Sequence, residues 1–244
     1  MTNGITSAVG DNSRPVLRNT NNQHWPLISS TANNGYSGLA IIPRWPTTIY
    51  WNCDLPACTL KEWQDTASGK ATFDDLLTFE RTTTTRYLLG LQKDAYMFHQ
   101  ANLRQTDVDS ITVGSQTGQL SLLQAWTETI VQEMTRLTDW PILSQKQDDL
   151  AVKYNERMAR DQCKPQLSYT YSNDGKSITA VTVTTSDGSN SCGTAIPVTL
   201  PGGTPTSSGK TSADKVGSEP LIMWVTLSGS AVKLNLPSPV TLLA

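Results

Sequence analysis

Residues 1 to about 162 alternate short apolar runs with segments in which apolar residues recur every three or four positions. The run Leu39–Ile42 follows the turn residues Asn33–Gly35 and is stopped by Pro43, which is typical of a buried strand that ends at a loop. Strands that alternate with helices favour an α/β architecture with parallel strands. We therefore expect the segment from Arg44 to Trp51 to form the loop after this strand.

Three longer segments carry the spacing of a helix. Apolar residues recur in this way from Phe73 to Leu91, although the β-branched run Thr82–Thr85 weakens the pattern. The segment Leu120–Leu137 is the clearest amphipathic helix. A third helix is expected over residues 150–158, and it begins near Asp148 and Asp149, whose charge suits a helix N-terminus. Helix capping explains this pair of acids better than a catalytic carboxylate pair does, because adjacent side chains on a helix diverge.

A short strand at Ala95–Phe98 places His99 at its C-terminal end. Catalytic residues collect at this end of the strands in barrels of parallel strands. An imidazole titrates near neutrality and can donate a proton to a leaving amine, so His99 is a candidate for acid/base chemistry. The alternative is a partly buried histidine that is hydrogen-bonded to a neighbouring carbonyl. A further short strand is expected at Pro141–Leu143.

Beyond Cys163 the pattern changes to β structure. Leu167–Tyr171 and Ile178–Val183 flank Asn173-Asp174-Gly175, which is a strong hairpin signal. Further strands are expected at 195–200, 221–227 and 231–236, with a flexible Gly/Ser/Thr/Pro segment at 202–210. We therefore divide the chain into residues 1–162, of α/β type, and residues 163–244, a small antiparallel β-sandwich-like module.

Composition and charge exclude several classes of function. The chain has 19 basic and 21 acidic residues and a formal charge of -2, which leaves no electrostatic footprint for nucleic acid or an anionic membrane. No stretch approaches the roughly 20 apolar residues of a membrane span, and the N-terminus lacks a signal-peptide pattern. A Gly-x-Ser-x-Gly elbow, a phosphate loop and a dinucleotide fingerprint are absent from the sequence, which removes the commonest hydrolase, kinase and dehydrogenase interpretations.

The four cysteines form two sets, Cys53 with Cys58 and Cys163 with Cys192. Each set lies within one expected structural unit, and an even count suits two disulfides. Zinc ligation is the alternative, but neither set has a CxxC spacing and neither His24 nor His99 is next to a cysteine. Disulfides are favoured, and they indicate an oxidising compartment. We expect no complete metal site within the chain.

The loop after the first strand combines Arg44 with Trp45 and Trp51. An arginine there could bind a carboxylate or hold an aspartate that acts as a base, while the indole faces could stack on sugar rings. A loop arginine beside core aromatic residues is the alternative.

Four strings in the chain, VGDNSRPVLRN, GLAIIPRWPTTIYWNCD, DAYMFHQANLR and PILSQKQDDLAVKYNERMARDQC, resemble the galactosaminogalactan deacetylases of moulds, also called extracellular serine-rich proteins. The similarity runs in order over residues 5 to 200. It implies a secreted enzyme whose catalytic (β/α) barrel uses a divalent metal, with zinc expected, to remove acetyl groups from amino sugars of a cell-wall or biofilm exopolysaccharide. On this resemblance the chain is the C-terminal half of a (β/α) polysaccharide-deacetylase barrel, followed by the β-rich module.

The resemblance also implies roles for individual residues. Arg44 resembles the arginine that orients the catalytic aspartate, and His99 would be the proton donor. The family's late motif places a histidine after Ile-x-Leu, whereas this chain has Ile142-Leu143-Ser144 without that histidine. We assign substrate contacts to Trp45, Tyr50, Trp51, Tyr96 and Asn102.

The family's metal ligands, an early aspartate and a His-x-x-x-His pair, have no counterpart in this sequence. The resemblance therefore implies that they belong to a missing N-terminal half of the same enzyme and that the chain alone is inactive. Its expected partner is a polysaccharide that contains N-acetylated amino sugars, and its expected location is extracellular. Two alternatives remain open at this point, a non-catalytic carbohydrate-binding or wall-associated protein, and a secreted structural protein that two disulfides stabilise.

Overall fold

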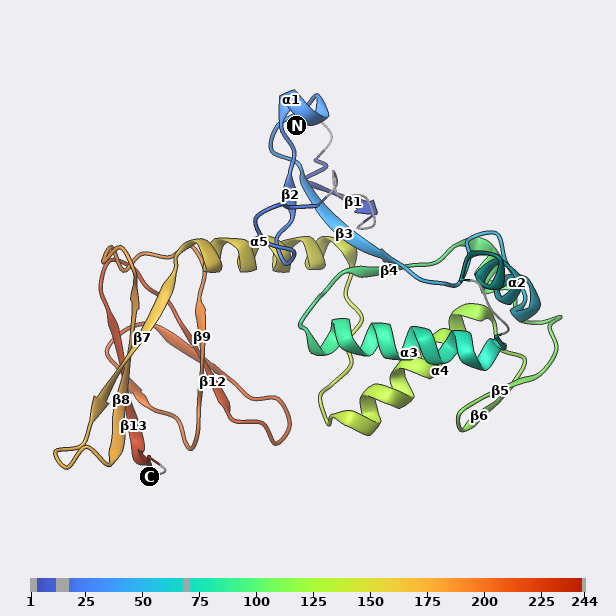
Figure 1. Cartoon of the computed structure of the whole chain (residues 1–244). Coiled ribbons are helices and arrows are strands. Elements are labelled where there is room, and N and C mark those ends of the chain that lie inside the picture. Colours follow the sequence, from blue (N-terminus) through green and yellow to red (C-terminus); the bar gives the residue numbers. More distant parts are fainter. Residues whose placement is uncertain (1–3, 12–17, 68–70, 243–244) are drawn as a thin grey trace. The chain divides into compact units, whose positions relative to one another are not determined.

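A computed structural model describes residues 4–11, 18–67 and 71–242 (Figure 1). The chain divides into two compact units, residues 1–151 and 152–244. The first unit combines helices with a largely parallel sheet, and strands dominate the second. The expected mixed α/β class is therefore confirmed. Among the described residues, no helix is long and apolar enough to cross a lipid bilayer.

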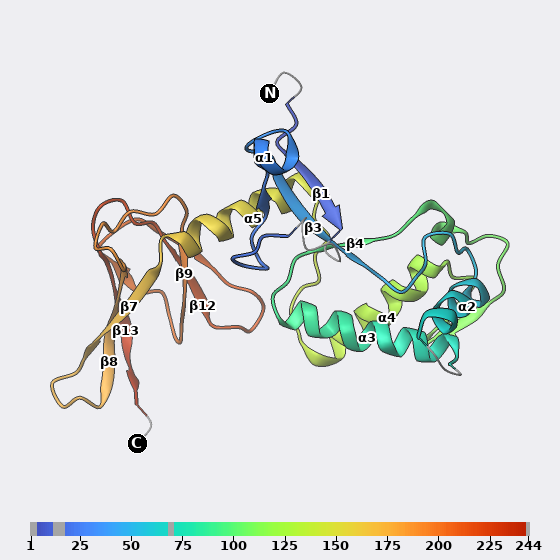
Figure 2. The same ribbon diagram turned by 45° about the horizontal axis from the view of Figure 1, so that its top comes forward.

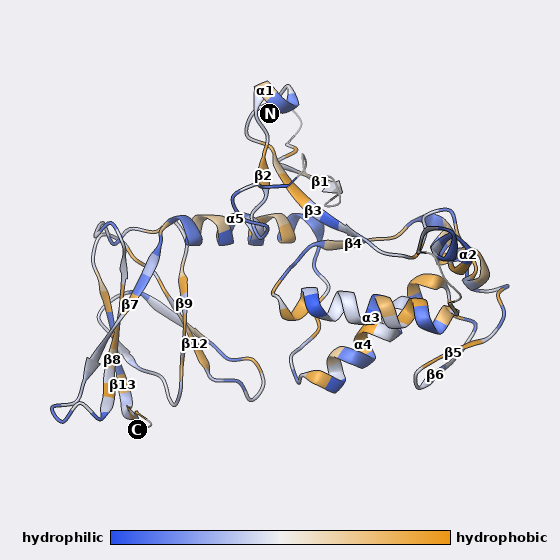
Figure 3. Ribbon diagram, viewed as in Figure 1, coloured by the Kyte–Doolittle hydropathy of each residue, from blue (hydrophilic) through white to orange (hydrophobic). Residues whose placement is uncertain are grey.

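The main sheet of the first unit is built around β3 (Ala40–Pro46). Both β1 (Ser7–Asp11) and β4 (Ala95–Met97) pair with it in parallel, while the short β2 (Leu27–Ile28) pairs antiparallel. Figure 2 shows β1 and β3 side by side, and Figure 3 shows the apolar residues along β3. The parallel pairing agrees with the alternation of strands and helices in the sequence.

The strand β3 runs further than the sequence indicated. We expected it to end at Pro43, but Arg44 and Trp45 continue the strand. The reason is a change of partner, because β1 pairs along Ala40–Arg44 and β4 pairs along Arg44–Pro46. Pro43 and Pro46 are each paired with a strand on one side only, so the missing N–H of proline costs no hydrogen bond to a second neighbouring strand.

Helices follow the strands of this sheet along the chain. After the single-turn α1 (Thr31–Asn34) come α2 (Pro56–Ala67), α3 (Phe73–Leu89), the 3-10 helix η2 (Gln100–Leu103), α4 (Leu122–Leu137) and α5 (Gln147–Gln162). A reciprocal cap begins α3, since the Thr72 hydroxyl accepts from the backbone N–H of Asp75 and the Asp75 carboxylate accepts from that of Thr72. This cap and the burial of Leu76 and Leu77 stabilise α3 more than the β-branched run Thr82–Thr85 destabilises it.

A hairpin of β5 (Ile111–Val113) and β6 (Gln116–Gly118) leads into α4. By contrast, the strand that we expected at Pro141–Leu143 does not form, and Ile142 and Leu143 are 50% and 73% exposed. An apolar run becomes a strand only where a partner strand satisfies its backbone, and none of the described strands pairs with this segment.

The β-rich part contains two antiparallel sheets. One has the order β10-β13-β8-β7 and the other β11-β12-β9, and their inward residues, Val183, Val225 and Leu234 among them, share one hydrophobic cluster. The strands are β7 (Pro165–Tyr171), β8 (Ser177–Thr185), β9 (Ile196–Leu200), β10 (Thr206–Ser207), β11 (Thr211–Asp214), β12 (Leu221–Val225) and β13 (Val232–Thr241).

The hairpin β7–β8 is confirmed, whereas the segment 202–210 is more ordered than a flexible linker, because β10 lies within it and pairs with β13. Both expected disulfides form. Cys53 bonds to Cys58 with a Cα–Cα distance of 5.4 Å, and Cys163 bonds to Cys192 at 5.6 Å.

Candidate functional site

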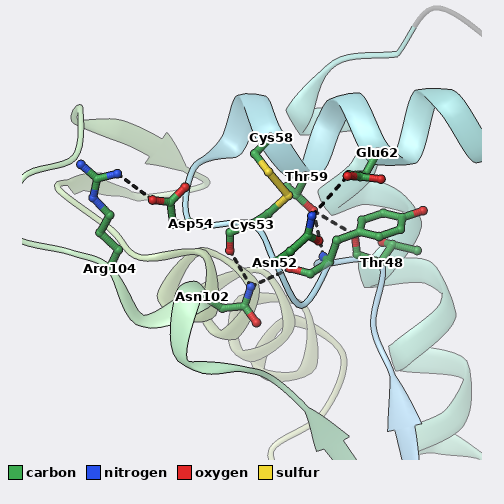
Figure 4. The surroundings of a disulfide bond; sticks show 10 residues. Thr48, Asn52, Cys53, Asp54, Cys58, Thr59, Glu62, Asn102 and Arg104 are labelled. Atoms are coloured by element: carbon green, nitrogen blue, oxygen red, sulfur yellow. Dashed lines mark hydrogen bonds and ion pairs between the residues drawn. A yellow bond between two sulfur atoms is a disulfide. The ribbon is translucent and has the colours of Figure 1, made fainter.

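The loop that follows β3, residues 47–54, is held by buried side chains of the first unit. Three buried polar side chains from three different helices bind its backbone. Figure 4 shows two of them, Thr59 and Asn102, together with the Cys53–Cys58 disulfide that ties the end of the loop to α2. The first is Thr59 of α2, which donates to the carbonyl of Thr48 and accepts from the backbone N–H of Tyr50, each at 3.1 Å. Because Thr59 is fully buried, these bonds do not compete with water.

The second is Glu80 of α3. One carboxylate oxygen accepts from the backbone N–H and the hydroxyl of Thr48, both at 2.7 Å, and the other accepts from the indole N–H of Trp126 at 2.7 Å. Three short donors compensate a carboxylate that is only 3% exposed. Glu80 thus joins the loop to α4.

The third is Asn102 of η2. Its amide nitrogen donates to the carbonyls of Tyr50 and Cys53 at 2.9 and 2.8 Å, and its amide oxygen accepts from the backbone N–H of His99 at 2.8 Å. The residue is completely buried and both of its N–H groups are used. We expected Asn102 to contact substrate, but it lies beneath the surface, where it fixes the loop and the start of η2 together.

Two aromatic side chains next to these buried hydrogen bonds are exposed to solvent. Trp51 is 68% exposed, and the exposed imidazole of His99 lies edge-on to it with ring centroids 6.3 Å apart. Asn102 bonds to residues on both sides of Trp51 and to the backbone of His99, so one buried side chain sets both positions. The fold therefore brings together two of the predicted site residues.

A shallow pocket of about 660 Å³ is lined by Asn52 and Gln100, the residues that follow Trp51 and His99 in the chain, and by Asp54. At its edge the Arg104 guanidinium donates to Asp54 at 2.7 Å and to Asp107 at 2.9 Å. The hydrogen bonds from Asp107 and Asp54 raise the pKa of Arg104, and Arg104 in turn lowers the pKa of Asp107. These charges are solvent-exposed, so they contribute little to stability and instead give the pocket a polar wall.

The other predicted aromatic residues are packed. Trp45 lies against Tyr87 with ring centroids 3.7 Å apart, and Tyr96 lies against Trp126 at 4.7 Å. Burial raises the pKa of Tyr96 well above its usual range. Tyr50 shares a hydrogen bond of 2.7 Å with the hydroxyl of Thr66. Among these residues, Trp51 has the most exposed ring, and the others are half-buried.

Arg44 lies apart from this pair. As neighbours on β3, Arg44 and Trp45 point to opposite faces of the sheet, and Arg44 is in register with Ala95, four residues before His99. Along an extended strand this is a separation of about 13 Å. The Nε atom of Arg44 is buried and has no hydrogen-bond partner among the described residues.

The site does not fit a resident metal. Within residues 4–11, 18–67 and 71–242, no three His, Cys, Asp or Glu side chains come together in a way that could hold an ion. A structural or catalytic zinc needs at least three protein ligands, so no metal-dependent step is assigned to the described residues.

Sequence reasoning missed Glu80 and Thr59. Glu80 could have been found, because it falls on the apolar stripe of α3 with Leu76, Leu77 and Thr84, where an acid requires buried donors. No local pattern marked the ion pair of Asp54 with Arg104, which are 50 residues apart.

The fold is that of a deacetylase family. A family model described as the Agd3 deacetylase domain matches residues 1–168, and one described as the Agd3 C-terminal domain matches residues 169–240. The chain belongs to the Agd3 deacetylase family, in agreement with the resemblance to deacetylases that the sequence strings indicated.

A crystal structure of Agd3, described as a novel carbohydrate deacetylase, superposes with a TM-score of 0.92 and is 49% identical in sequence. The similarity covers 99% of this chain and 36% of that one. This chain thus spans little more than a third of the length of that relative. No curated protein sequence matched the chain.

Proposed function

We propose that the chain is part of a metal-dependent carbohydrate esterase that removes N-acetyl groups from amino sugars of an extracellular, galactosaminogalactan-like polysaccharide. Membership of the Agd3 deacetylase family and the 49% identity to a carbohydrate deacetylase support this reaction. In this proposal residues 1–162 are the C-terminal half of a (β/α) barrel and residues 163–244 are a sandwich-like module. The metal, with zinc expected, is held by polypeptide outside this chain, so the chain alone is inactive.

The exposed pair of Trp51 and His99 is the observation that carries the proposal. Trp51 is 68% exposed, and an exposed indole can stack on the apolar face of a pyranose ring. The imidazole beside it can donate a proton to the nitrogen that leaves when an amide bond is cleaved. The buried bonds of Glu80, Thr59 and Asn102 hold both groups before substrate arrives, which reduces the entropy lost on binding.

The two disulfides support an extracellular location, since such bonds persist in oxidising compartments. The Cys53–Cys58 bond also restrains the loop of the candidate site, because it ties the end of that loop to α2.

A binding and turnover experiment on the chain tests the proposal. N-acetylgalactosamine oligomers are titrated into wild type, Trp51→Ala and Trp140→Ala, a second exposed tryptophan outside the site, and acetate release is followed with added zinc. We expect oligomer binding that weakens about two- to tenfold in Trp51→Ala, since an aromatic stack is worth about 0.5 to 1.5 kcal/mol. Trp140→Ala should bind as wild type does, and no acetate should appear.

Acetate release by the chain would show that it needs no outside ligands for the metal. Equal binding by Trp51→Ala and wild type would remove the observation on which the proposal rests.

A second candidate is a non-catalytic carbohydrate-binding protein, which the exposed indole of Trp51 favours because stacking requires no acid or base. The discriminating variant is His99→Ala in a polypeptide extended to the length of the Agd3 relative. A lower kcat with unchanged oligomer binding supports the enzyme. Binding without acetate release in both the extended wild type and the variant supports the binding protein.

A further inference from the structure

A second polar pocket, of about 560 Å³, lies between α3, α4 and the turn of the β5–β6 hairpin. One stripe of α3 and one stripe of α4 line its sides, with residues spaced three or four positions apart on each helix. None of its lining residues belongs to the loop 47–54 or to the segment 99–104. Its volume lies within the range of about 300 to 1,000 Å³ that is usual for small-molecule sites.

The pocket has an apolar floor and a fixed wall. Leu77 and Val113, both buried, form the floor. The amide of Gln132 donates to the carbonyl of Val113 at 3.1 Å and accepts from the backbone N–H of Ser115 at 3.2 Å, which holds the hairpin turn against α4. Gly114 has a φ of +55°, and a Cβ atom there would overlap the Gln132 side chain. The glycine and the glutamine therefore interlock, and the wall is formed without a ligand.

Charged groups of both signs surround the opening. Asp74 and Glu133 provide two carboxylates, and Arg81 and Arg136 provide two guanidinium groups, so the four formal charges cancel. Arg136 donates to both oxygens of Glu133 at 2.7 and 2.9 Å, and this pairing lowers the pKa of Glu133 and keeps it an acceptor. The charge of Arg81 also lowers the pKa of Glu133, but among the described residues the ion pair of Glu133 is with Arg136, so the N–H donors of Arg81 remain available to a ligand.

We propose that this pocket binds a neutral carbohydrate of one or two pyranose rings. Adjacent ring hydroxyls both donate and accept, so they can bind a carboxylate and a guanidinium at once, whereas an anion would meet Asp74 and Glu133 and a cation would meet Arg81. The C–H groups of a pyranose can contact Leu77 and Val113. The inference does not depend on the deacetylase proposal, because it involves different residues and no reaction.

Binding of defined disaccharides to the whole chain tests this proposal. Diacetylchitobiose and lactose serve as neutral probes, and chitobiose with free amines and a uronic-acid disaccharide serve as charged ones, with affinities from calorimetry and contacts from saturation-transfer NMR. We expect the neutral probes to bind at least tenfold more tightly than the charged ones. Arg81→Ala and Thr78→Met, which fills the opening with a longer side chain that has no aromatic ring, should each reduce binding of the neutral probes at least fivefold. Arg86→Ala, an exposed arginine of α3 outside the pocket, should not change it.

The Trp51→Ala variant separates this inference from the proposed function. If the neutral probes no longer bind to Arg81→Ala but still bind to Trp51→Ala, the sugar lies in the α3–α4 pocket. If binding of the neutral probes is partly lost in each single variant and completely lost when both substitutions are combined, the sugar binds in both sites. Unchanged binding in both Arg81→Ala and Thr78→Met overturns the proposal. So does the absence of any binding of the neutral probes to wild type with a Kd below about 50 mM. Circular dichroism of each variant confirms that the fold is retained.

Discussion

Replacement of Asn102 by alanine is the sharpest test of how the candidate site is built. The substitution removes two donors and one acceptor at a completely buried position and leaves the carbonyls of Tyr50 and Cys53 and the N–H of His99 without their partner. A buried polar group that loses its partner costs about 1 to 3 kcal/mol. Because Tyr50 and His99 are partly open to water, we expect a total loss of about 3 to 5 kcal/mol in the free energy of unfolding.

Urea unfolding followed by far-ultraviolet circular dichroism and tryptophan emission measures this loss. The matched control is Asn52→Ala in the same loop, since the exposed Asn52 amide makes a single long bond of 3.3 Å to Glu62 and should cost less than about 0.5 kcal/mol. Asn102→Ala should also weaken binding of amino-sugar oligomers at temperatures where it remains folded, because Trp51 and His99 lose their common support. Equal stability of the two variants would show that the Asn102 bonds do not hold the loop.

Three further predictions concern the surroundings of the site and the second unit. Glu80→Gln should lower the free energy of unfolding by about 2 kcal/mol, since an amide NH₂ must face either Thr48 or the Trp126 N–H, and wild-type stability in urea would contradict this. Removal of the Cys163–Cys192 bond by serine substitution should lower the free energy of unfolding by about 3 to 4 kcal/mol, and removal of Cys53–Cys58 should lower it by about 2 kcal/mol. The difference is expected because the bridged cysteines are 29 and 5 positions apart, and equal losses in calorimetry would refute the loop-length argument. The hydrogen bonds with Thr72 lower the pKa of Asp75 below 3.8. The ionised Asp75 therefore contributes its full stabilisation above that pH, and this contribution is lost as the pH falls through the lower pKa of the folded state. Asp75→Asn should flatten the decline of the urea midpoint below pH 4, and an unchanged slope would show that the cap is not coupled to folding.

Features that depend on neighbours in the chain could be predicted from the sequence. The helices over 73–89 and 122–137, the β7–β8 hairpin at Asn173–Gly175 and the two cysteine pairs all follow from periodicity, turn residues or spacing. His99 was also placed correctly at the end of a short strand, since an apolar run followed by polar residues is a local signal.

The tertiary structure alone decided which residues form the site. Trp45 and Trp51 have similar surroundings in the sequence, yet Trp45 packs on Tyr87 of α3 and Trp51 stays open to solvent. Whether Ile142 and Leu143 form a strand depends on a partner strand, and periodicity does not reveal one. Asn102 binds residues 49 and 52 positions away, and Glu80 binds residues 32 and 46 positions away. The sequence thus determined the local elements and their order, while burial and long-range hydrogen bonds, which arise only when distant segments meet, determined where chemistry can occur.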